Sequence, residues 1–179
     1  MRTRLTILAL LAALLLPASA SALDLSIRTH LGPDLGYRYS SVAGHGMAFG
    51  IGGDVLLGPV GIGVRSEWTV DKVFKEKEER TLARTANWVH VGAALGFGVL
   101  ELHLGAGPGI GWVRVPTTTE RLPSWGMHEF AAAYLSTSEF LRLGIRMEFH
   151  QLWQPQYSDD MDVGVGIQLA FMFRIGGDD

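Results

Sequence analysis

The sequence predicts an all-β chain, an eight-stranded, antiparallel, up-and-down transmembrane β-barrel that follows a cleaved signal peptide. Apolar residues recur at every second position through most of residues 23–175, which is the pattern of strands and not of helices. No apolar run after residue 22 is long enough for a transmembrane helix, although the mean hydropathy is positive at +0.20. Both observations fit a transmembrane barrel, because each of its strands exposes only alternate residues to lipid.

The N-terminal segment has the features of a secretory signal peptide. Arg2 and Arg4 give it a positive start, residues 5–16 form an apolar core, and Ala20-Ser21-Ala22 matches the small-x-small pattern of a cleavage site. We expect cleavage after Ala22, which leaves a barrel over residues 23–175 and a short polar tail over residues 176–179. A retained N-terminal anchor is the alternative, but a spanning helix takes about 20 apolar residues.

Seven segments alternate clearly, with apolar residues on one parity and glycines, charged residues and histidines on the other. They cover residues 25–32, 47–55, 60–71, 88–99, 100–112, 141–153 and 162–175. Residues 127–138 form a weaker segment, and residues 128–143 also fit a helix, but we predict a strand because bacterial single-chain barrels have an even number of strands. In this strand we expect Phe130, Ala132 and Tyr134 to point outward. Glu129, Ala131 and Ala133 are then expected to point inward. Pro108 lacks an N–H for its ladder, so a bulge or a lost bond is expected there.

The connections between these segments alternate in length. Tight turns are predicted at residues 58–59, 99–101 and 136–138, and longer polar loops at residues 39–46, 71–84, 115–126 and 154–161. In bacterial barrels the short turns face the periplasm and the long loops face outward. Both termini are therefore expected in the periplasm.

The apolar parity is expected to face lipid. The lysines all lie in one predicted loop, at positions 72, 75 and 77, so the chain lacks the lysine-rich outer face of a soluble barrel. The polar parity combines glycines with charges of both signs, which suits a narrow lumen in which every buried charge needs a partner. The predicted lumen network consists of Arg28, Asp54, Arg65, Glu67, Arg142, Arg146 and Glu148. A soluble periplasmic lipocalin-like barrel, with the apolar parity around a ligand, is the alternative.

The aromatic residues support the outward assignment, because they sort by height. Trp68, Trp112 and Trp153 are expected near the outer ends of strands, and Phe97, Tyr134 and Phe171 near the periplasmic ends. Two such belts are where amphipathic rings settle at membrane interfaces.

Composition excludes several classes of function. There is no cysteine, so neither a lipoprotein anchor nor a disulfide is possible. The net charge is −3 and no basic stripe exists, which leaves nucleic-acid binding without support. Eight strands enclose a space that side chains fill, so a porin-sized channel is not expected. The mixed charge run at residues 75–80 is typical of a solvated loop tip; an adhesive or lipopolysaccharide-contacting role is the alternative.

The last predicted strand resembles an assembly signal. Residues 166–173, Gly-Ile-Gln-Leu-Ala-Phe-Met-Phe, place spaced apolar and aromatic residues after a glycine, although six more residues follow where a terminal aromatic is usual. With the strand number and loop alternation, the chain resembles the OmpA/OmpX-like superfamily of small outer-membrane barrels over residues 23–175. The resemblance implies insertion by the barrel-insertion machinery. The family covers many roles, so membership does not confer a function. We expect a monomeric barrel of structural or surface-interaction type, in contact with outer-membrane lipid and lipopolysaccharide.

Two chemical alternatives remain to be weighed. His30, His90, His103 and His150 all fall on the inner parity, but counting along the strands puts them at different heights, so no shared metal site and no cofactor are predicted. Some barrels of this kind modify lipid A through serine, histidine and a carboxylate. Glu148 and His150 share a face here, yet Leu152 stands where a serine is needed, and Ser124 or Ser158 would have to serve as nucleophile. We therefore expect no enzyme.

Overall fold

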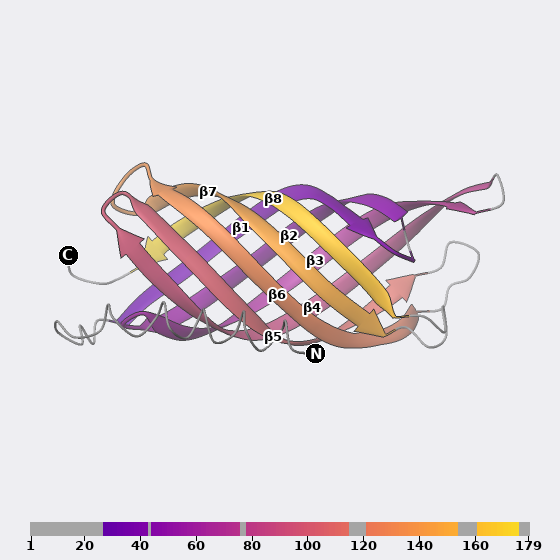
Figure 1. Cartoon of the computed structure of the whole chain (residues 1–179), viewed down its shortest axis with the longest axis horizontal. Coiled ribbons are helices and arrows are strands. Elements are labelled where there is room, and N and C mark those ends of the chain that lie inside the picture. The colour runs from indigo at the N-terminus through magenta and orange to yellow at the C-terminus, as the bar shows by residue number, and fades with distance from the viewer. Residues whose placement is uncertain (1–26, 43, 76–77, 115–120, 154–160, 176–179) are drawn as a thin grey trace, which may run out of the picture.

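The chain forms a closed barrel of eight antiparallel strands in sequence order, with β8 paired to β1 (Figure 1). The computed structural model describes residues 27–42, 44–75, 78–114, 121–153 and 161–175. The strands are β1 (Ile27–Ser40), β2 (Gly44–Leu57), β3 (Val60–Lys75), β4 (Glu78–Phe97), β5 (Leu100–Arg114), β6 (Arg121–Ser136), β7 (Leu141–Trp153) and β8 (Asp162–Ile175). Among these residues no helix is long and apolar enough to cross a membrane. The predicted signal peptide and the tail at residues 176–179 lie outside the described residues.

The register of the strands sets a strong tilt. Followed from pair to pair around the wall, the path runs from Arg28 through Leu56, Gly61, Gly92, Gly105, Phe130, Glu148 and Gly166 to Arg38. The path returns to β1 ten residues beyond its start, from position 28 to position 38. With ordinary strand spacing and rise, this shear corresponds to a tilt of about 40°. Residues that face each other across the lumen are therefore offset along their strands.

Three short connections, β2–β3, β4–β5 and β6–β7, lie at one end of the barrel. Gly58 between β2 and β3 and Gly98 between β4 and β5 have positive φ, at 59° and 64°, a conformation that glycine adopts without steric cost. The third tight turn, between β6 and β7, is closed by a hydrogen bond from the Thr137 hydroxyl to the Leu141 carbonyl at 2.8 Å. These positions match the predicted tight turns.

At the other end, two of the predicted loops are wrong. Residues 39–46 were expected as a loop, but Tyr39 pairs with His45, and only a short turn separates β1 from β2. Residues 71–84 were also expected as a loop, but β3 continues to Lys75 and β4 begins at Glu78, so a long hairpin projects beyond the barrel (Figure 1). Because the two strands of the hairpin pair with each other, their backbone N–H and C=O groups are hydrogen-bonded. These strands therefore form although the sequence there does not alternate between apolar and polar residues. Of the other two predicted loops, residues 115–120 and 154–160 lie outside the described residues, and β6 begins at Arg121, earlier than expected.

The outer face of the barrel is apolar, as predicted. Side chains such as Ile62, Val64 and Val91 are 65, 61 and 64 % exposed, and Trp68, Trp112 and Trp153 also point outward. So large an exposed apolar surface requires lipid around it. The lipocalin-like alternative needs these side chains around an internal ligand and does not fit this arrangement.

The strand predicted in residues 127–138 exists, but its predicted parity is wrong. Phe130, Ala132 and Tyr134 are only 7, 6 and 6 % exposed and point into the lumen, whereas Glu129 faces outward. Glycines on the neighbouring strands make room for the two rings. A Cβ on Gly105 would lie 2.4 Å from the Phe130 ring, and one on Gly144 would lie 2.6 Å from the Tyr134 ring.

Proline interrupts two of the ladders without shifting their register. Trp88 pairs with Gly109 and Val91 with Ala106, while Pro108 and its neighbour leave a gap between β4 and β5. The lost bond predicted at Pro108 is thus confirmed, and there is no bulge at this point. The same effect occurs at Pro33, where the pairing of β1 with β8 stops at Leu31 and resumes at Asp34.

Candidate functional site

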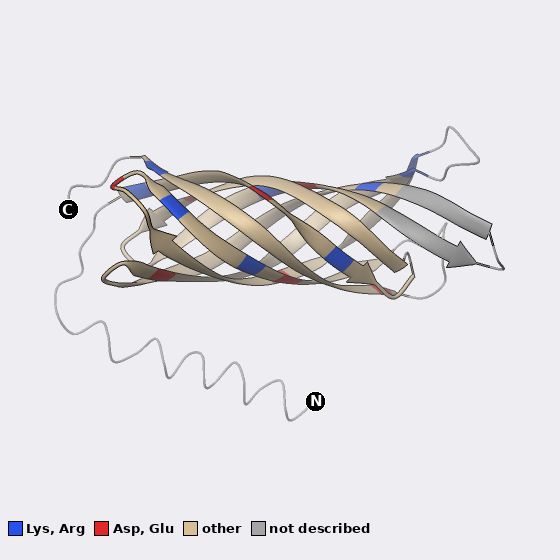
Figure 2. Cartoon of the chain, turned by 90° about the horizontal axis from the view of Figure 1, so that it is seen from above, with Lys and Arg blue, Asp and Glu red and all other residues tan. Residues whose placement is uncertain are grey.

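The lumen is the chemically distinctive part of the molecule. Charged positions follow the wall along its whole length (Figure 2), and most of those described carry side chains buried inside. Buried lumen residues with polar side chains include Asp34, Arg38, Arg65, Glu67, Arg84, Glu101, His128, Arg142, Arg146, Glu148, His150, Asp162 and Gln168. Because alternate residues of every strand point inward, eight strands deliver these groups to one narrow space.

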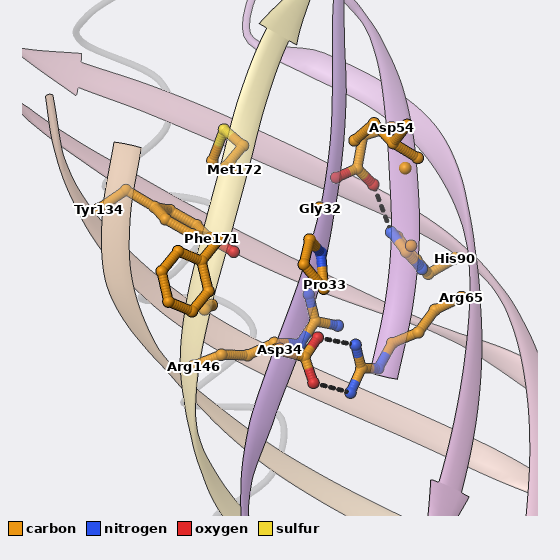
Figure 3. A pocket seen from close by; sticks show the side chains of 14 residues that line it. Gly32, Pro33, Asp34, Asp54, Arg65, His90, Tyr134, Arg146, Phe171 and Met172 are labelled. Carbon is orange, nitrogen blue, oxygen red and sulfur yellow. Dashed lines mark hydrogen bonds and ion pairs between the residues drawn. The ribbon is translucent and has the colours of Figure 1, made fainter. Parts of the chain in front are cut away.

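Arg65 on β3 is the centre of the lumen. Its guanidinium forms a two-pronged ion pair with Asp34 on β1, with Nη2 donating to Oδ1 at 2.8 Å (Figure 3). Its Nε lies 2.9 Å from Oε1 of Glu148 on β7, and its Nη2 lies 3.3 Å from Oε2 of Glu67. One cation thus joins carboxylates from three strands, and its side chain is only 1 % exposed.

Two further arginines complete this group. Arg146 Nε donates to Glu148 Oε1 at 2.6 Å, and its guanidinium carbon lies 3.7 Å from the centre of the Phe130 ring, within cation–π range. Arg38 Nη1 donates to Glu67 Oε1 at 2.6 Å. The central network, as we name it, comprises Asp34, Arg38, Arg65, Glu67, Arg146 and Glu148. It contains three cations and three carboxylates, so its formal charge is zero.

The central network leaves little free space. The cavity beside it has a volume of about 30 Å³, enough for one or two water molecules. Figure 3 shows its lining, with Tyr134 and Met172 on one side and Asp54 and His90 on the other. Gly50 is part of the same packing, because a Cβ there would lie 2.3 Å from the Arg65 guanidinium nitrogens.

The structure brings together four of the seven residues predicted for a lumen network, namely Arg65, Glu67, Arg146 and Glu148. The other three point inward but have separate partners. Arg28 Nη2 donates to the Gly58 carbonyl at 2.9 Å, Asp54 lies 2.5 Å from Nε2 of His90, and Arg142 pairs with Glu101.

Sequence reasoning missed Asp34, Arg38 and Gln168 in this region. Gln168 Nε2 donates to Glu148 Oε2 at 3.2 Å. Asp34 and Arg38 share the parity of Arg28, and this signal could have found them. They lie beyond residue 32, where the first alternating segment was expected to end.

A second polar group ties the strands near the long hairpin. Asp162 at the start of β8 pairs with Arg84 on β4 and accepts from the Ser40 hydroxyl at 2.6 Å. It also accepts from the Val42 backbone N–H at 3.2 Å, just beyond the end of β1. One carboxylate therefore links β1, β4 and β8 at this end of the lumen.

A third group lies near the short turns and corrects the predicted separation of the histidines. We name His30 on β1, Glu101 and His103 on β5, and Arg142 on β7 the floor cluster. The rings of His30 and His103 have centroids 5.2 Å apart, although strand counting put them at different heights. The shear is the reason, because β1 and β5 lie on opposite walls and their facing residues are offset. His90 contacts Asp54 and His150 contacts Arg38, so these two histidines stay apart from the floor cluster.

The residues considered for a hydrolase do not form a triad in the described part of the chain. Glu148 is held by Arg65 and Arg146, and the Nε2 atom of His150 faces the Arg38 guanidinium. A general base needs that nitrogen directed at a nucleophile. Ser124 is buried on β6, and Ser158 lies outside the described residues.

Comparison with known proteins gives a clear result at the level of fold. No protein-family model and no curated protein match the sequence. Among solved structures, Neisserial surface protein A superposes with a TM-score of 0.66 at 8 % identity, covering 81 % of this chain and 96 % of that one. Ail of Yersinia pestis, in complex with the heparin analogue sucrose octasulfate, superposes with a TM-score of 0.52 at 14 % identity, covering 82 % and 99 %. The fold is that of a small eight-stranded outer-membrane β-barrel. This confirms the fold that the resemblance to the OmpA/OmpX-like superfamily implied.

Proposed function

We propose that this chain is a monomeric, non-enzymatic outer-membrane barrel of a Gram-negative envelope, with a structural or surface-interaction role. Both termini lie in the periplasm, and the β3–β4 hairpin projects from the cell surface. The observation that carries the proposal is the contrast between a lumen closed by a network without net charge and a predominantly apolar lipid-facing wall with a hairpin extending beyond it.

The closed lumen argues against transport. The central network links β1, β3 and β7 across the lumen, and the cavity beside it has a volume of only about 30 Å³. Opening a channel would separate ion pairs that are nearly inaccessible to water, and breaking such a pair costs about 3–5 kcal/mol. The network therefore acts as a rigid internal brace.

The hairpin argues for a role at the surface. β4 is the longest strand at 20 residues, and it pairs with β3 out to the contact of Lys75 with Glu78. Neighbours of the same fold are described as a surface protein and as an attachment invasion locus protein with a bound heparin analogue. The mixed charges at residues 75–80 suit contact with lipopolysaccharide or with a polar partner, although the side chains of residues 71–82 lie outside the description.

Two partners follow from the wall itself. The tryptophans near the hairpin end suit the polar boundary of the outer leaflet, where outer-membrane lipid and lipopolysaccharide meet the barrel. Residues 166–173 on β8 keep the spacing that the barrel-insertion machinery reads, and Ile167, Leu169 and Phe171 face outward there.

The orientation can be tested with two matched epitope insertions. One epitope is placed at residues 76–77, between β3 and β4, and the other in the β2–β3 turn at residues 58–59. We expect antibody to label the first on intact cells and the second only after the outer membrane is permeabilised. Labelling of the turn on intact cells contradicts the orientation, and recovery of the chain in a soluble periplasmic fraction contradicts the membrane barrel.

The absence of a channel and of lipid chemistry can be tested separately. The purified barrel in planar bilayers is expected to give no stable conductance, while a porin in the same bilayers gives steps. The lipid A of cells that express the chain should match that of cells with the His150→Ala variant. A difference in acylation between the two would restore the hydrolase alternative.

A further inference from the structure

The floor cluster brings three metal-binding donor atoms close together inside the lumen. His30 reaches in from β1, and Glu101 and His103 reach in from the opposite wall at β5. His103 Nε2 lies 2.7 Å from Glu101 Oε1, and His30 Nε2 lies 4.0 Å from the same oxygen. All three donors lie within 4.8 Å of one another, and all three residues are buried.

These distances fit a tetrahedral zinc ion. With zinc–nitrogen and zinc–oxygen bonds near 2.0–2.2 Å, two ligands of one ion stand about 3.4 Å apart. The observed 2.7 Å and 4.0 Å bracket that separation, and all three donors lie within 4.8 Å of one another, so side-chain movements of about 1 Å would bring them to it. Two imidazoles with one carboxylate is also a donor set that zinc uses in proteins.

His30 supplies an independent reason to expect a ligand. Its side chain is 1 % exposed, and among the described residues neither ring nitrogen has a hydrogen-bond partner. A buried polar atom without a partner is costly, and a metal ion would satisfy it. His30 differs in this from His90, His128 and His150, because Nε2 of each of those three has a hydrogen-bond partner.

The surroundings supply the remaining parts of such a site. Arg142 pairs with Oε2 of Glu101 and so holds the carboxylate with Oε1 toward the histidines, as outer-shell partners of metal ligands do. A cavity of about 10 Å³, close to the space that one water molecule needs, adjoins His103 on the side of Asp54.

We propose that His30, Glu101 and His103 bind one divalent transition-metal ion, zinc by preference, at the short-turn end of the lumen. The ion joins β1 to β5 across the barrel. It braces the end of the lumen that the central network does not reach.

The test uses the untagged mature chain folded in detergent, stripped with EDTA and titrated calorimetrically with zinc chloride. We expect one zinc ion per barrel and a higher urea midpoint in the presence of zinc. Each of the variants His30→Gln, Glu101→Gln and His103→Gln should bind zinc at least 100-fold more weakly. The matched control is His45→Gln, which removes an exposed histidine at the opposite end and should leave the affinity unchanged.

Several outcomes would overturn the site. These are no saturation at one equivalent in the unaltered chain, and equal weakening by His45→Gln and His103→Gln. Heat-modifiable gel migration reports whether each variant folds. If a variant does not fold, zinc-edge X-ray absorption of the unaltered chain still decides the matter. Two imidazoles with oxygen ligands support the site, and fewer than two imidazoles refute it.

Discussion

The middle of the lumen and its floor are built from the same kinds of residue but differ in how their charges are matched. In the central network, Arg65 faces three carboxylates and each carboxylate faces at least one arginine. In the floor cluster, two histidines face a single glutamate that Arg142 already engages. Every charge of the central network faces an opposite charge of the protein, whereas the floor cluster gathers three donor atoms within 4.8 Å of one another. Equal burial therefore does not mean equal sensitivity to mutation.

The largest effect on stability is expected from Glu148→Ala, which removes a carboxylate of the central network. The change leaves Arg65 and Arg146 with less compensation in a space that excludes water. We expect the free energy of unfolding to fall by about 3–5 kcal/mol. Urea unfolding of the barrel in lipid vesicles, followed by tryptophan fluorescence, measures it.

The matched control for this variant is Glu129→Ala on the neighbouring strand. Glu129 faces outward from β6, so its removal takes a charge off the lipid-facing wall. Stability should stay the same or rise by less than about 1 kcal/mol. If both variants lose the same stability, the cause is the removal of a glutamate from the barrel wall and not the disruption of the central network.

A smaller effect is expected from Gly50→Ala. This variant keeps every charged residue of the central network but displaces the guanidinium of Arg65. The added methyl group would overlap the Arg65 guanidinium, which must then shift away from Asp34. The expected loss is about 1–3 kcal/mol in the same unfolding measurement. Gly96→Ala is the control, because a Cβ at Gly96 has no atom within 4 Å. Equal losses in the two variants would mean that backbone conformation, not the guanidinium, decides the cost.

The smallest effect is expected at the floor, from His30→Phe in the presence of EDTA. No hydrogen bond is lost, because neither nitrogen of His30 has a partner among the described residues, and the tilted ring contact with His103 is kept. The free energy of unfolding should change by less than about 1 kcal/mol. His128→Phe, which removes the 3.3 Å contact with Glu148, should cost more. A larger loss at His30 than at His128 would show that the floor is already complete without a metal.

How far the sequence predicts this molecule depends on whether a strand distinguishes its two faces. Seven strands carry large apolar residues on one face and glycines and charged residues on the other. The difference predicts directly which face of each strand points outward. In β6 the choice lay between Phe130 with Tyr134 and Glu129 with Ala131, and the expected outward preference of aromatic rings gave the wrong answer. The deciding fact was space, since Gly105 and Gly144 on the neighbouring strands leave room for the rings inside. That fact requires the register between strands.

The candidate sites depend on register even more strongly. Charge and parity alone predicted Arg65, Glu67, Arg146 and Glu148 as lumen residues, and they lie in one network. The convergence of His30 and His103 could not be predicted, because it depends on the shear of the barrel. A shift of one strand against the next leaves every alternation pattern intact and changes which residues meet across the axis.

The gap at Pro33 has a consequence for how the wall holds together. It falls in the contact between β1 and β8, which joins the two ends of the described chain and has ten paired residues, fewer than any other neighbouring pair in the described part. This contact also closes the longest loop, so it carries the greatest entropic cost of formation. We expect the β1–β8 pairing to form last during assembly and to open first on heating. The backbone amides of this pairing should therefore exchange with solvent before those of the other strand pairs.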